Sequence, residues 1–341
     1  MLKSRIVFRA DGNSQIGLGH IYRCVAMIQM LVYEFNCLFI TNKPDAKIAD
    51  LIRSYCSLHT IKVQNKDEEI DVLEGILTSG DIVVTDGYDF DPEYQNQIKQ
   101  RVKKLVMIDD LAQMYFIADV IINHGGTPII AKYRKEKETK LLIGFDYLLL
   151  RKEFLETARK PRTIHKTNTV FICMGGADPF KITIKVLKAC LKTRFIEKII
   201  IVTGNEYRDQ AELDYLIRNN KGKNILHKCN IDAFMMTRLI YESQIAICPS
   251  STIALEVCCT QAGLISGTVI NNQKAIHKQL VEAGCCVSVG DFKKASLKLM
   301  IIALKRFNDL NFTRSMMIRQ SVKIDRKSGE RIVNLFKELS A

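Results

Sequence analysis

Residues Arg5–Arg23 read RIVFRADGNSQIGLGHIYR, which is a short apolar run, a loop with glycines at 12, 17 and 19, and the start of an amphipathic pattern. A buried strand, a glycine-rich turn and a helix in this order are typical of the first unit of a doubly wound α/β domain. Backbone N–H groups at such a helix start point into the loop. We therefore expect an anion or a sugar oxygen to bind there.

The same alternation continues along the N-terminal half. Strands are predicted at Arg5–Arg9, Cys37–Thr41, Asp81–Thr85, Leu105–Ile108 and Asp119–Ile122, and helices at His20–Tyr33, Asp45–Tyr55, Glu69–Thr78 and Pro92–Lys103. From Thr127 to Lys166 a basic stretch interrupts the pattern, with one amphipathic segment around Arg151–Arg159. This rhythm predicts a parallel sheet covered by helices on both faces.

A second series repeats the pattern in the C-terminal half. Strands are predicted at Thr169–Cys173, Lys198–Thr203, Asn224–Leu226, Gln244–Ile247 and Gly263–Ile270, and helices at Phe180–Thr193, Tyr207–Asn219, Asp232–Tyr241, Thr252–Cys259, Ala275–Glu282, Lys293–Phe307 and Asp325–Leu339. We therefore predict two doubly wound Rossmann-type domains facing a central cleft, over residues 1–150 and 151–320. Residues 321–341 are predicted to form a C-terminal helix that packs back on the N-terminal domain.

Composition excludes several classes of protein. Apolar residues make up 47% and charged residues 26%, which is ordinary for a globular chain and unlike a disordered or collagen-like one. No run of 18 apolar residues exists, so no stable membrane insertion is expected. The eleven cysteines form no Cys-x-x-Cys pair and fall mostly in apolar runs, as expected of reduced thiols in the cytoplasm rather than of zinc ligands.

The net charge of +13 favours an anionic partner. The sequence carries no RRM, zinc-finger or KH signature, so the expected partner is a small anionic molecule and not a nucleic acid.

The first loop fits neither a dinucleotide site nor a P-loop. Tyr22 stands where a dinucleotide fingerprint starting at Gly17 requires a third glycine, and the Walker lysine is missing. His20 lies at the helix start, where a neutral imidazole can accept a proton from water near neutral pH. Capping or packing of the first helical turn is the competing interpretation of His20.

Two loops of the C-terminal half predict a nucleoside-diphosphate site. Gly175 and Gly176 follow a strand and free the backbone to surround a pyrophosphate. Ser250-Ser251-Thr252 starts a helix that suits a phosphate, and Glu256, one turn later, suits ribose hydroxyls. A plain helix cap is the alternative for the second loop.

Smaller polar segments follow other strands. Asp86–Asp91 is rich in carboxylates, which would suit either magnesium or simple turn chemistry, and Tyr88 is the likelier substrate contact there. The amides of Asn272 and Gln273 could hold acetamido groups. The other histidines, including His124 and His277, show no partner pattern and are taken as structural.

Several of these motifs together resemble the UDP-sugar hydrolases of pseudaminic acid biosynthesis. The matching stretches span roughly residues 5–280 and are Gly17-x-Gly19-His20-x-x-Arg23, Asp86-x-Tyr88, Asp109-Asp110, Gly144-x-x-Tyr147, Gly175-Gly176-x-Asp178, Ser250-Ser251 with Glu256, and Asn272-Gln273. The chain departs from the resemblance at Gly87, in the basic stretch Lys132–Lys140 and in its C-terminal extension.

The resemblance implies a GT-B architecture and hydrolysis of UDP-2,4-diacetamido-2,4,6-trideoxy-β-L-altropyranose, without a metal or other cofactor. By this resemblance His20 is the general base, and water attack opposite UDP inverts the anomeric carbon. The residues expected around the sugar are Gly17, Gly19, Arg23, Tyr88, Asn272 and Gln273, and those around UDP are Gly175, Gly176, Ser251, Thr252 and Glu256. A GT-B glycosyltransferase with a UDP-sugar donor and a non-catalytic binding protein remain alternatives.

Overall fold

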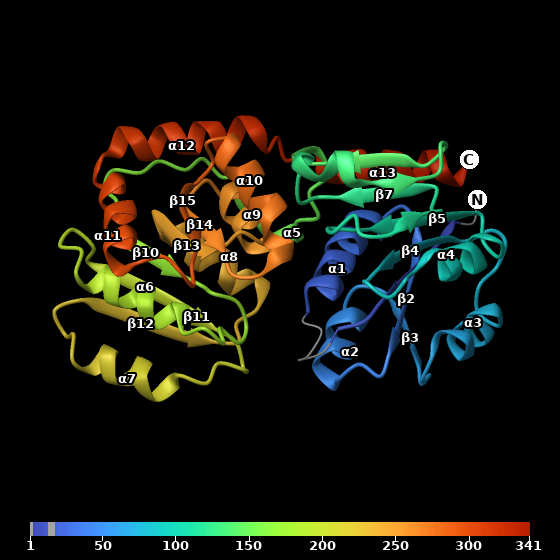
Figure 1. Cartoon of the computed structure of the whole chain (residues 1–341), viewed down its shortest axis with the longest axis horizontal. Helices are drawn as coiled ribbons and strands as arrows, with labels where there is room; N and C mark the ends of the chain where they lie inside the picture. The colour runs from blue at the N-terminus through green and yellow to red at the C-terminus, as the bar shows by residue number, and fades with distance from the viewer. Residues whose placement is uncertain (1–2, 13–17) are drawn as a thin grey trace. The chain divides into compact units, whose positions relative to one another are not determined.

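The computed structural model describes residues 3–12 and 18–341, and the chain divides into two compact units (Figure 1). Unit 1 comprises Met1–Lys152 together with Lys327–Ala341, and unit 2 comprises Glu153–Arg326. The chain therefore crosses from unit 1 to unit 2 and returns to unit 1 for its last residues.

Unit 1 is built on a seven-stranded parallel sheet in the order β3-β2-β1-β4-β5-β7-β9. Its strands are β1 (Arg5–Ala10), β2 (Asn36–Asn42), β3 (Ser57–Ile61), β4 (Ile82–Asp86), β5 (Lys104–Ile108), β7 (Val120–Asn123) and β9 (Lys140–Ile143). The short strands β6 (Tyr115–Phe116) and β8 (Arg134–Lys135) pair separately. The helices are α1 (Gly19–Leu31), α2 (Ala46–Arg53), α3 (Lys66–Glu74), α4 (Pro92–Lys99) and α13 (Ser328–Ser340).

Side-chain alternation along the strands creates one core on each face of this sheet. Ile6 and Phe8 of β1 pack in the cluster that contains α1 and α13, whereas Val7 packs in the cluster that contains α3 and α4. Both faces are buried, which explains why the central strands read as continuous apolar runs.

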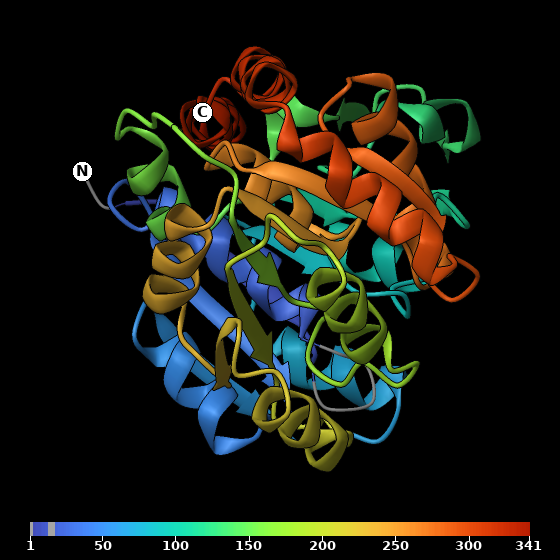
Figure 2. The ribbon, with the colours of Figure 1, turned by 90° about the vertical axis from the view of Figure 1, so that its left-hand side faces the viewer.

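The terminal helix α13, dark red in Figures 1 and 2, is part of the first of these cores. Its residues Ile332, Leu335 and Phe336 are buried there, and the Phe336 ring lies 6.3 Å from that of Phe35. The Ser340 carbonyl also accepts a hydrogen bond from Lys103 Nζ at 2.6 Å. The last residues of the chain are thus a structural part of unit 1.

Unit 2 has six parallel strands in the order β12-β11-β10-β13-β14-β15. They are β10 (Thr169–Ile172), β11 (Lys198–Thr203), β12 (Asn224–Cys229), β13 (Ile245–Pro249), β14 (Gly263–Thr268) and β15 (Val287–Asp291). The helices are α5 (Lys152–Ala158), α6 (Ile182–Leu191), α7 (Gln210–Arg218), α8 (Ala233–Glu242), α9 (Thr252–Cys259), α10 (Lys274–Glu282), α11 (Leu297–Lys305) and α12 (Leu310–Lys323). This is the strand order of a dinucleotide-binding Rossmann domain.

The predicted fold class is confirmed, but helix α12 and three strands of the two main sheets were not predicted. Strands β3, β9 and β15 were not predicted, and all three are edge strands, which lack the long apolar runs of buried strands. The helix predicted over Lys293–Phe307 begins only at Leu297, because the Ser296 side chain caps it by accepting a hydrogen bond from Leu299 N. Residues 321–323 belong to α12, so the terminal helix begins later than the predicted boundary.

Within the described residues, no helix is long and apolar enough to cross a membrane.

Candidate functional site

Each sheet has a point where the strand order reverses direction, between β1 and β4 in unit 1 and between β10 and β13 in unit 2. Ligands of open α/β sheets bind beyond the carboxyl ends of the strands at such points. In unit 1, His20 lies on the helix that follows β1, and Asp86 is the last residue of β4. In unit 2, Gly175 and Gly176 follow β10, and Ser250 and Ser251 follow β13.

The unit 1 site is a buried cluster of one imidazole, one guanidinium and two carboxylates. Asp86 Oδ1 lies 2.6 Å from His20 Nδ1 and 2.6 Å from Arg23 Nη2, and Asp86 Oδ2 accepts from Arg23 Nε at 2.8 Å. Arg23 Nη1 donates to Asp110 Oδ2 at 2.7 Å. His20 and Arg23 are one helical turn apart on α1, so both reach the same carboxylate.

The contact with Asp86 determines which imidazole nitrogen is available as a base. Arg23 Nη2 also lies 2.8 Å from Nδ1, but a guanidinium only donates hydrogen bonds. Nδ1 cannot donate a hydrogen bond to Asp86 and accept one from Arg23 at the same time. Its distance to the Asp86 carboxylate, 2.6 Å, is shorter than its distance to Arg23 Nη2, 2.8 Å. We therefore assign the proton of the neutral ring to Nδ1, which places the basic lone pair on Nε2.

The charges of the cluster keep Asp86 ionised. Burial acts to raise the pKa of Asp86, but the charge of Arg23 and the hydrogen bond from His20 outweigh it and hold that pKa below its usual value. Burial disfavours the charged form of Arg23, yet Asp86 and Asp110 raise its pKa well above the ordinary value. The carboxylate that orients His20 is thus an anion at neutral pH.

Tyr88 covers one side of the imidazole. Its ring packs edge-on against His20 with the ring centroids 4.8 Å apart, and its hydroxyl lies 3.4 Å from Asp110 Oδ2. The residue is 42% exposed, so its remaining surface is accessible from solvent. The imidazole is thus covered on one side by a ring that is itself partly open to solvent; the role of Tyr88 as a substrate contact stays a prediction.

Asp109 and Tyr133 support the cluster from the neighbouring strand end. Asp109 Oδ2 accepts hydrogen bonds from the Ala112 backbone at 2.8 Å and from the Tyr133 hydroxyl at 2.7 Å. The same hydroxyl accepts from Asn123 Nδ2 at 2.8 Å. Asp109 therefore fixes the loop after β5, which carries Asp110.

His124 lies on the α1 face of the sheet together with Asp86 and Asp110. In each case the residue two positions earlier packs in the hydrophobic core that contains α1. Side chains two positions apart along a strand point to the same face of the sheet. His124 is buried, and none of the residues that the structure describes provides a hydrogen-bond partner for its Nδ1. Burial, followed by the charge of Arg23, lowers the pKa of His124 to about 4, so the folded protein keeps this ring neutral.

We expect His124 to make unfolding strongly pH-dependent. The unfolded chain protonates this ring near a pKa of about 6.5 and the folded chain only near about 4, so stability is lost as the pH falls from about 6.5 towards 4. The shift corresponds to about 3 kcal/mol. In urea titrations, His124→Asn should show a flatter dependence of the unfolding free energy on pH in this window than the wild type. The same change at exposed His59 is the control, and equal slopes for wild type and His124→Asn would contradict the expectation.

In unit 2, the glycine turn after β10 is closely packed on the loop after β11. Gly175 has φ of +92°, which favours glycine, and Gly204 N donates to the Gly176 carbonyl at 3.1 Å. A Cβ at Gly204 would lie 2.6 Å from Gly176 Cα. Gly204, which sequence reasoning missed, is therefore required for this close approach, and the only sequence signal is a glycine directly after a strand.

The two helix starts next to the unit 2 reversal point differ in how they are capped. Asp178 accepts hydrogen bonds from Ile182 N at 2.9 Å and Thr183 N at 2.6 Å, so a carboxylate already occupies the start of α6. Ser251 is the N-cap of α9, and its side chain makes no capping hydrogen bond. Of these two helix starts, α9 is the one whose N–H groups suit an incoming anion.

Other polar residues lie around α9. Ser250 Oγ bonds to His277 Nδ1 and to Ser266 Oγ, both at 2.8 Å, so His277 has partners that its sequence context did not indicate. Thr252 begins α9, and Glu256 is buried one turn further on. At the end of β14, Gln273 Oε1 accepts from Val269 N at 2.7 Å, which leaves the amide NH₂ as its donor group.

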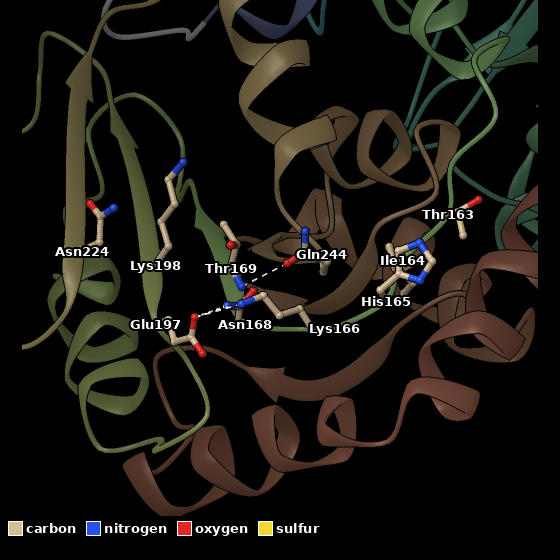
Figure 3. Close-up of a pocket in the computed structure, with 10 residues that line it drawn as sticks. All are labelled: Thr163, Ile164, His165, Lys166, Asn168, Thr169, Glu197, Lys198, Asn224 and Gln244. Atoms are coloured by element: carbon tan, nitrogen blue, oxygen red, sulfur yellow. Dashed lines mark hydrogen bonds and ion pairs between the residues drawn. The ribbon is translucent and has the colours of Figure 1, made fainter.

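A separate cavity of about 550 Å³ lies at the opposite end of the unit 2 strands (Figure 3). It is lined by residues just before or at the starts of β10, β11, β12 and β13, including Lys166, Asn168, Glu197 and Gln244. These polar groups bind one another, since Lys166 pairs with Glu197 at 3.1 Å and Gln244 Oε1 accepts from Thr169 N at 3.1 Å. The cavity lies away from the reversal point, and the site residues predicted from sequence do not line it.

The magnesium alternative for Asp86–Asp91 finds no support in the geometry. Asp86 binds His20 and Arg23, whereas Asp91 caps α4 through Tyr94 N at 2.9 Å and pairs with Lys66 at 2.6 Å. No group of three or more metal-ligating side chains occurs in the part of the chain that the structure describes. Gly17, predicted near the substrate, lies outside the described residues, and Gly19 begins α1.

Comparison with solved structures defines the fold type. Acinetobacter baumannii MurG matches with a TM-score of 0.66 and 10% identity, covering 98% of this chain and 99% of that one. A UDP-glucosyltransferase from Polygonum tinctorium matches with a TM-score of 0.70 and 10% identity, covering 100% of this chain and 99% of that one. The fold is that of the GT-B glycosyltransferases, as predicted.

Comparison with curated sequences confirms the predicted resemblance. The UDP-2,4-diacetamido-2,4,6-trideoxy-β-L-altropyranose hydrolase of Campylobacter jejuni is 24% identical over 285 residues, covering 82% of this chain and 97% of that protein. An uncharacterized protein of Methanocaldococcus jannaschii is 28% identical over 240 residues, or 67% of this chain, and the match spans about half of that protein, 48%. No protein-family model matches the chain.

Proposed function

We propose that the chain hydrolyses UDP-2,4-diacetamido-2,4,6-trideoxy-β-L-altropyranose to UDP and 2,4-diacetamido-2,4,6-trideoxy-L-altropyranose in the cytoplasm. The observation that carries the proposal is the imidazole of His20, held through Nδ1 by the ionised Asp86 at the reversal point of unit 1. The C. jejuni relative, whose name gives this reaction, supports the choice of substrate.

In the proposed mechanism, Nε2 of His20 removes a proton from water as the water oxygen attacks the anomeric carbon. The bond from that carbon to the UDP oxygen breaks, and its electron pair leaves with UDP. Attack opposite the leaving group inverts the configuration. UDP leaves as a stabilised anion, so no general acid and no metal are required, and Asp86 stabilises the imidazolium that forms.

We assign the two ends of the substrate to different units. The proposed sugar contacts in the N-terminal half are Gly17, Gly19, Arg23 and Tyr88, with Arg23 acting through Asp86 and Asp110. Unit 2 binds UDP through Gly175, Gly176 and the start of α9 at Ser251 and Thr252, with Glu256 towards the ribose. Asn272 and Gln273 are the proposed contacts of the acetamido groups.

Product analysis tests the function directly. The purified protein is incubated with the UDP-diacetamido-trideoxyaltrose in EDTA, and the anomeric proton is followed by NMR. We expect prompt release of UDP and an initial free sugar of inverted configuration. Tight binding without turnover would contradict the proposal and favour a glycosyltransferase that requires an acceptor, an alternative that the solved structures support by fold.

We expect Glu256→Gln to weaken UDP binding about tenfold, because a carboxylate accepts stronger hydrogen bonds from hydroxyls than an amide does. Calorimetry with UDP and 2′-deoxy-UDP measures the effect. The wild type should prefer UDP, and the variant should lose most of that preference. Glu242→Gln, the same change at an exposed residue of α8, is the control. An unchanged preference for UDP in Glu256→Gln would remove Glu256 from the ribose site.

A further inference from the structure

Two buried polar atoms next to the unit 1 cluster are left without a hydrogen bond. They are Nδ1 of His124 and Oδ1 of Asp110, and neither has a partner among the residues that the structure describes. His124 is 1% exposed, and the side chain of Asp110 is 10% exposed. Most buried polar groups in proteins are hydrogen-bonded, because an unpaired one raises the free energy of the folded state. Such atoms therefore indicate a place where a ligand group binds.

The two residues are neighbours at the ends of adjacent strands. Ile108 of β5 pairs with Ile122 of β7, and Asp109 N continues this pairing by donating to the Ile122 carbonyl at 3.0 Å. Asp110 and His124 each come two residues after the paired isoleucines, so they lie next to each other on the face that α1 covers. We call these two residues the His124–Asp110 pair. It occupies the same face and the same edge of the sheet as the unit 1 cluster.

A chain of hydrogen bonds fixes the backbone around this pair. The Tyr133 hydroxyl donates to Asp109 Oδ2 at 2.7 Å and accepts from Asn123 Nδ2 at 2.8 Å, and Asn123 Oδ1 accepts from Gly125 N at 2.7 Å. The chain thus includes the residue before the carboxylate and the residues on both sides of the imidazole. A pair held in this way is preorganised for a ligand, which lowers the entropic cost of binding.

The chemistry of the two atoms defines the group that fits them. Asp110 Oδ2 accepts a hydrogen bond from Arg23 Nη1 at 2.7 Å, and the remaining oxygen can only accept as well, so the ligand has to donate. Burial, followed by the charge of Arg23, lowers the pKa of His124 to about 4, so its ring is neutral and Nδ1 can donate or accept. The nearby guanidinium disfavours a cationic ligand, and a phosphate has no hydrogen to donate. An uncharged N–H or O–H group is the ligand that suits the pair.

We propose that the His124–Asp110 pair binds a ring substituent of the substrate sugar that carries an N–H or O–H group. The inference rests on the proposed function, in which the sugar lies beside His20. In a 2,4-diacetamido-2,4,6-trideoxy sugar, the two acetamido N–H groups and the C3 hydroxyl are the candidates. The pair determines specificity, because a sugar without the donor leaves two buried polar groups unpaired, which sites of this kind reject strongly.

Titration of the full chain with the free sugar product, followed by NMR, tests the proposal without turnover. We expect His124→Leu to weaken sugar binding about tenfold, because it removes Nδ1, and to leave UDP affinity unchanged. His124→Asn should retain most of the sugar affinity, because an asparagine amide also donates and accepts hydrogen bonds. Analogues with hydrogen in place of the substituent at C2, C3 or C4 identify the group. The analogue that lacks it should bind the wild type and His124→Leu equally.

Thr85→Val is the matched control. Thr85 Oγ1 is also buried and has no partner among the described residues, but Thr85 pairs with Met107, which packs in the core on the opposite face of the sheet. This variant should keep wild-type sugar affinity, and circular dichroism checks that every variant is folded.

The possible failures of the two proposals are distinguishable. Wild-type sugar affinity in His124→Leu, or an equal loss in Thr85→Val, would overturn the role of the pair and leave the proposed hydrolysis intact. A fall in kcat of His124→Leu with unchanged sugar affinity would overturn it in favour of a bound water molecule. Sugar binding that depends on His124 in a protein that hydrolyses no UDP-sugar would support the pair and contradict the proposed function. A wild type that binds no sugar would overturn both.

Discussion

His20→Asn is expected to lose turnover of the UDP-sugar by about 10²-fold or more while its affinity for UDP stays unchanged. The change removes the nitrogen base, and asparagine cannot take a proton from water. UDP binding is assigned to unit 2, which the substitution does not touch. Steady-state kinetics gives the loss in kcat, and calorimetry gives the affinity for UDP.

The exposed His59 on β3 provides the matched control, since His59→Asn makes the same chemical change in unit 1 outside the cluster. It should retain wild-type kcat. An unchanged rate for His20→Asn would remove His20 from the mechanism. A loss of both rate and UDP affinity would instead indicate a structural role.

The second large effect is expected for Asp86→Asn, which should reduce both turnover and stability. An asparagine no longer fixes the Nδ1–H form of His20 or stabilises the imidazolium, and we expect kcat to fall about 10³-fold. It also leaves Arg23 buried with one carboxylate, Asp110, and not two. Breaking a buried ion pair in this way costs about 3 kcal/mol. Steady-state kinetics and urea denaturation measure the two effects.

The other end of the same strand supplies the control. Asp81 is also buried and binds Arg5 through two hydrogen bonds of 2.7 and 2.6 Å, but it lies just before β4 begins, away from the reversal point. Asp81→Asn should lower stability and leave kcat of the folded protein unchanged. Equal losses of kcat in Asp81→Asn and Asp86→Asn would show that the effect on turnover is only structural.

The sequence predicts the central strands well because both faces of those strands are buried. Continuous apolar runs such as Ile199–Val202 and Ile245–Cys248 follow directly from that burial. An edge strand such as Ser57–Ile61 has mostly exposed side chains, so its sequence carries no comparable signal. Helix α12 has a weak apolar periodicity for a related reason, because Thr313 and Gln320 share its buried side with two methionines while Ile318 and Val322 are exposed.

The site was less predictable because its contacts are not local. The place of His20 at a helix start indicates a functional residue, but its partner Asp86 is 66 residues away, in a segment whose local pattern indicates a turn or a metal site. The pairing arises because β4 lies directly beside β1 in the sheet, which no local pattern reports. Arg23 is predicted near the substrate, and the structure adds that its guanidinium is engaged by Asp86 and Asp110, which its sequence context does not indicate. The roles of these residues in catalysis and binding stay predictions.

The return of the chain to unit 1 affects how the protein folds while it is being translated. Residues Ile332, Leu335 and Phe336 leave the ribosome only after all of unit 2 has been made, yet they belong to the same core as β1 and α1. Until then, the nascent unit 1 exposes the apolar surface of α1 that α13 later covers. Unit 2 is contiguous in the chain and can fold first, whereas the half that carries His20 reaches its final packing only when synthesis of this segment is finished.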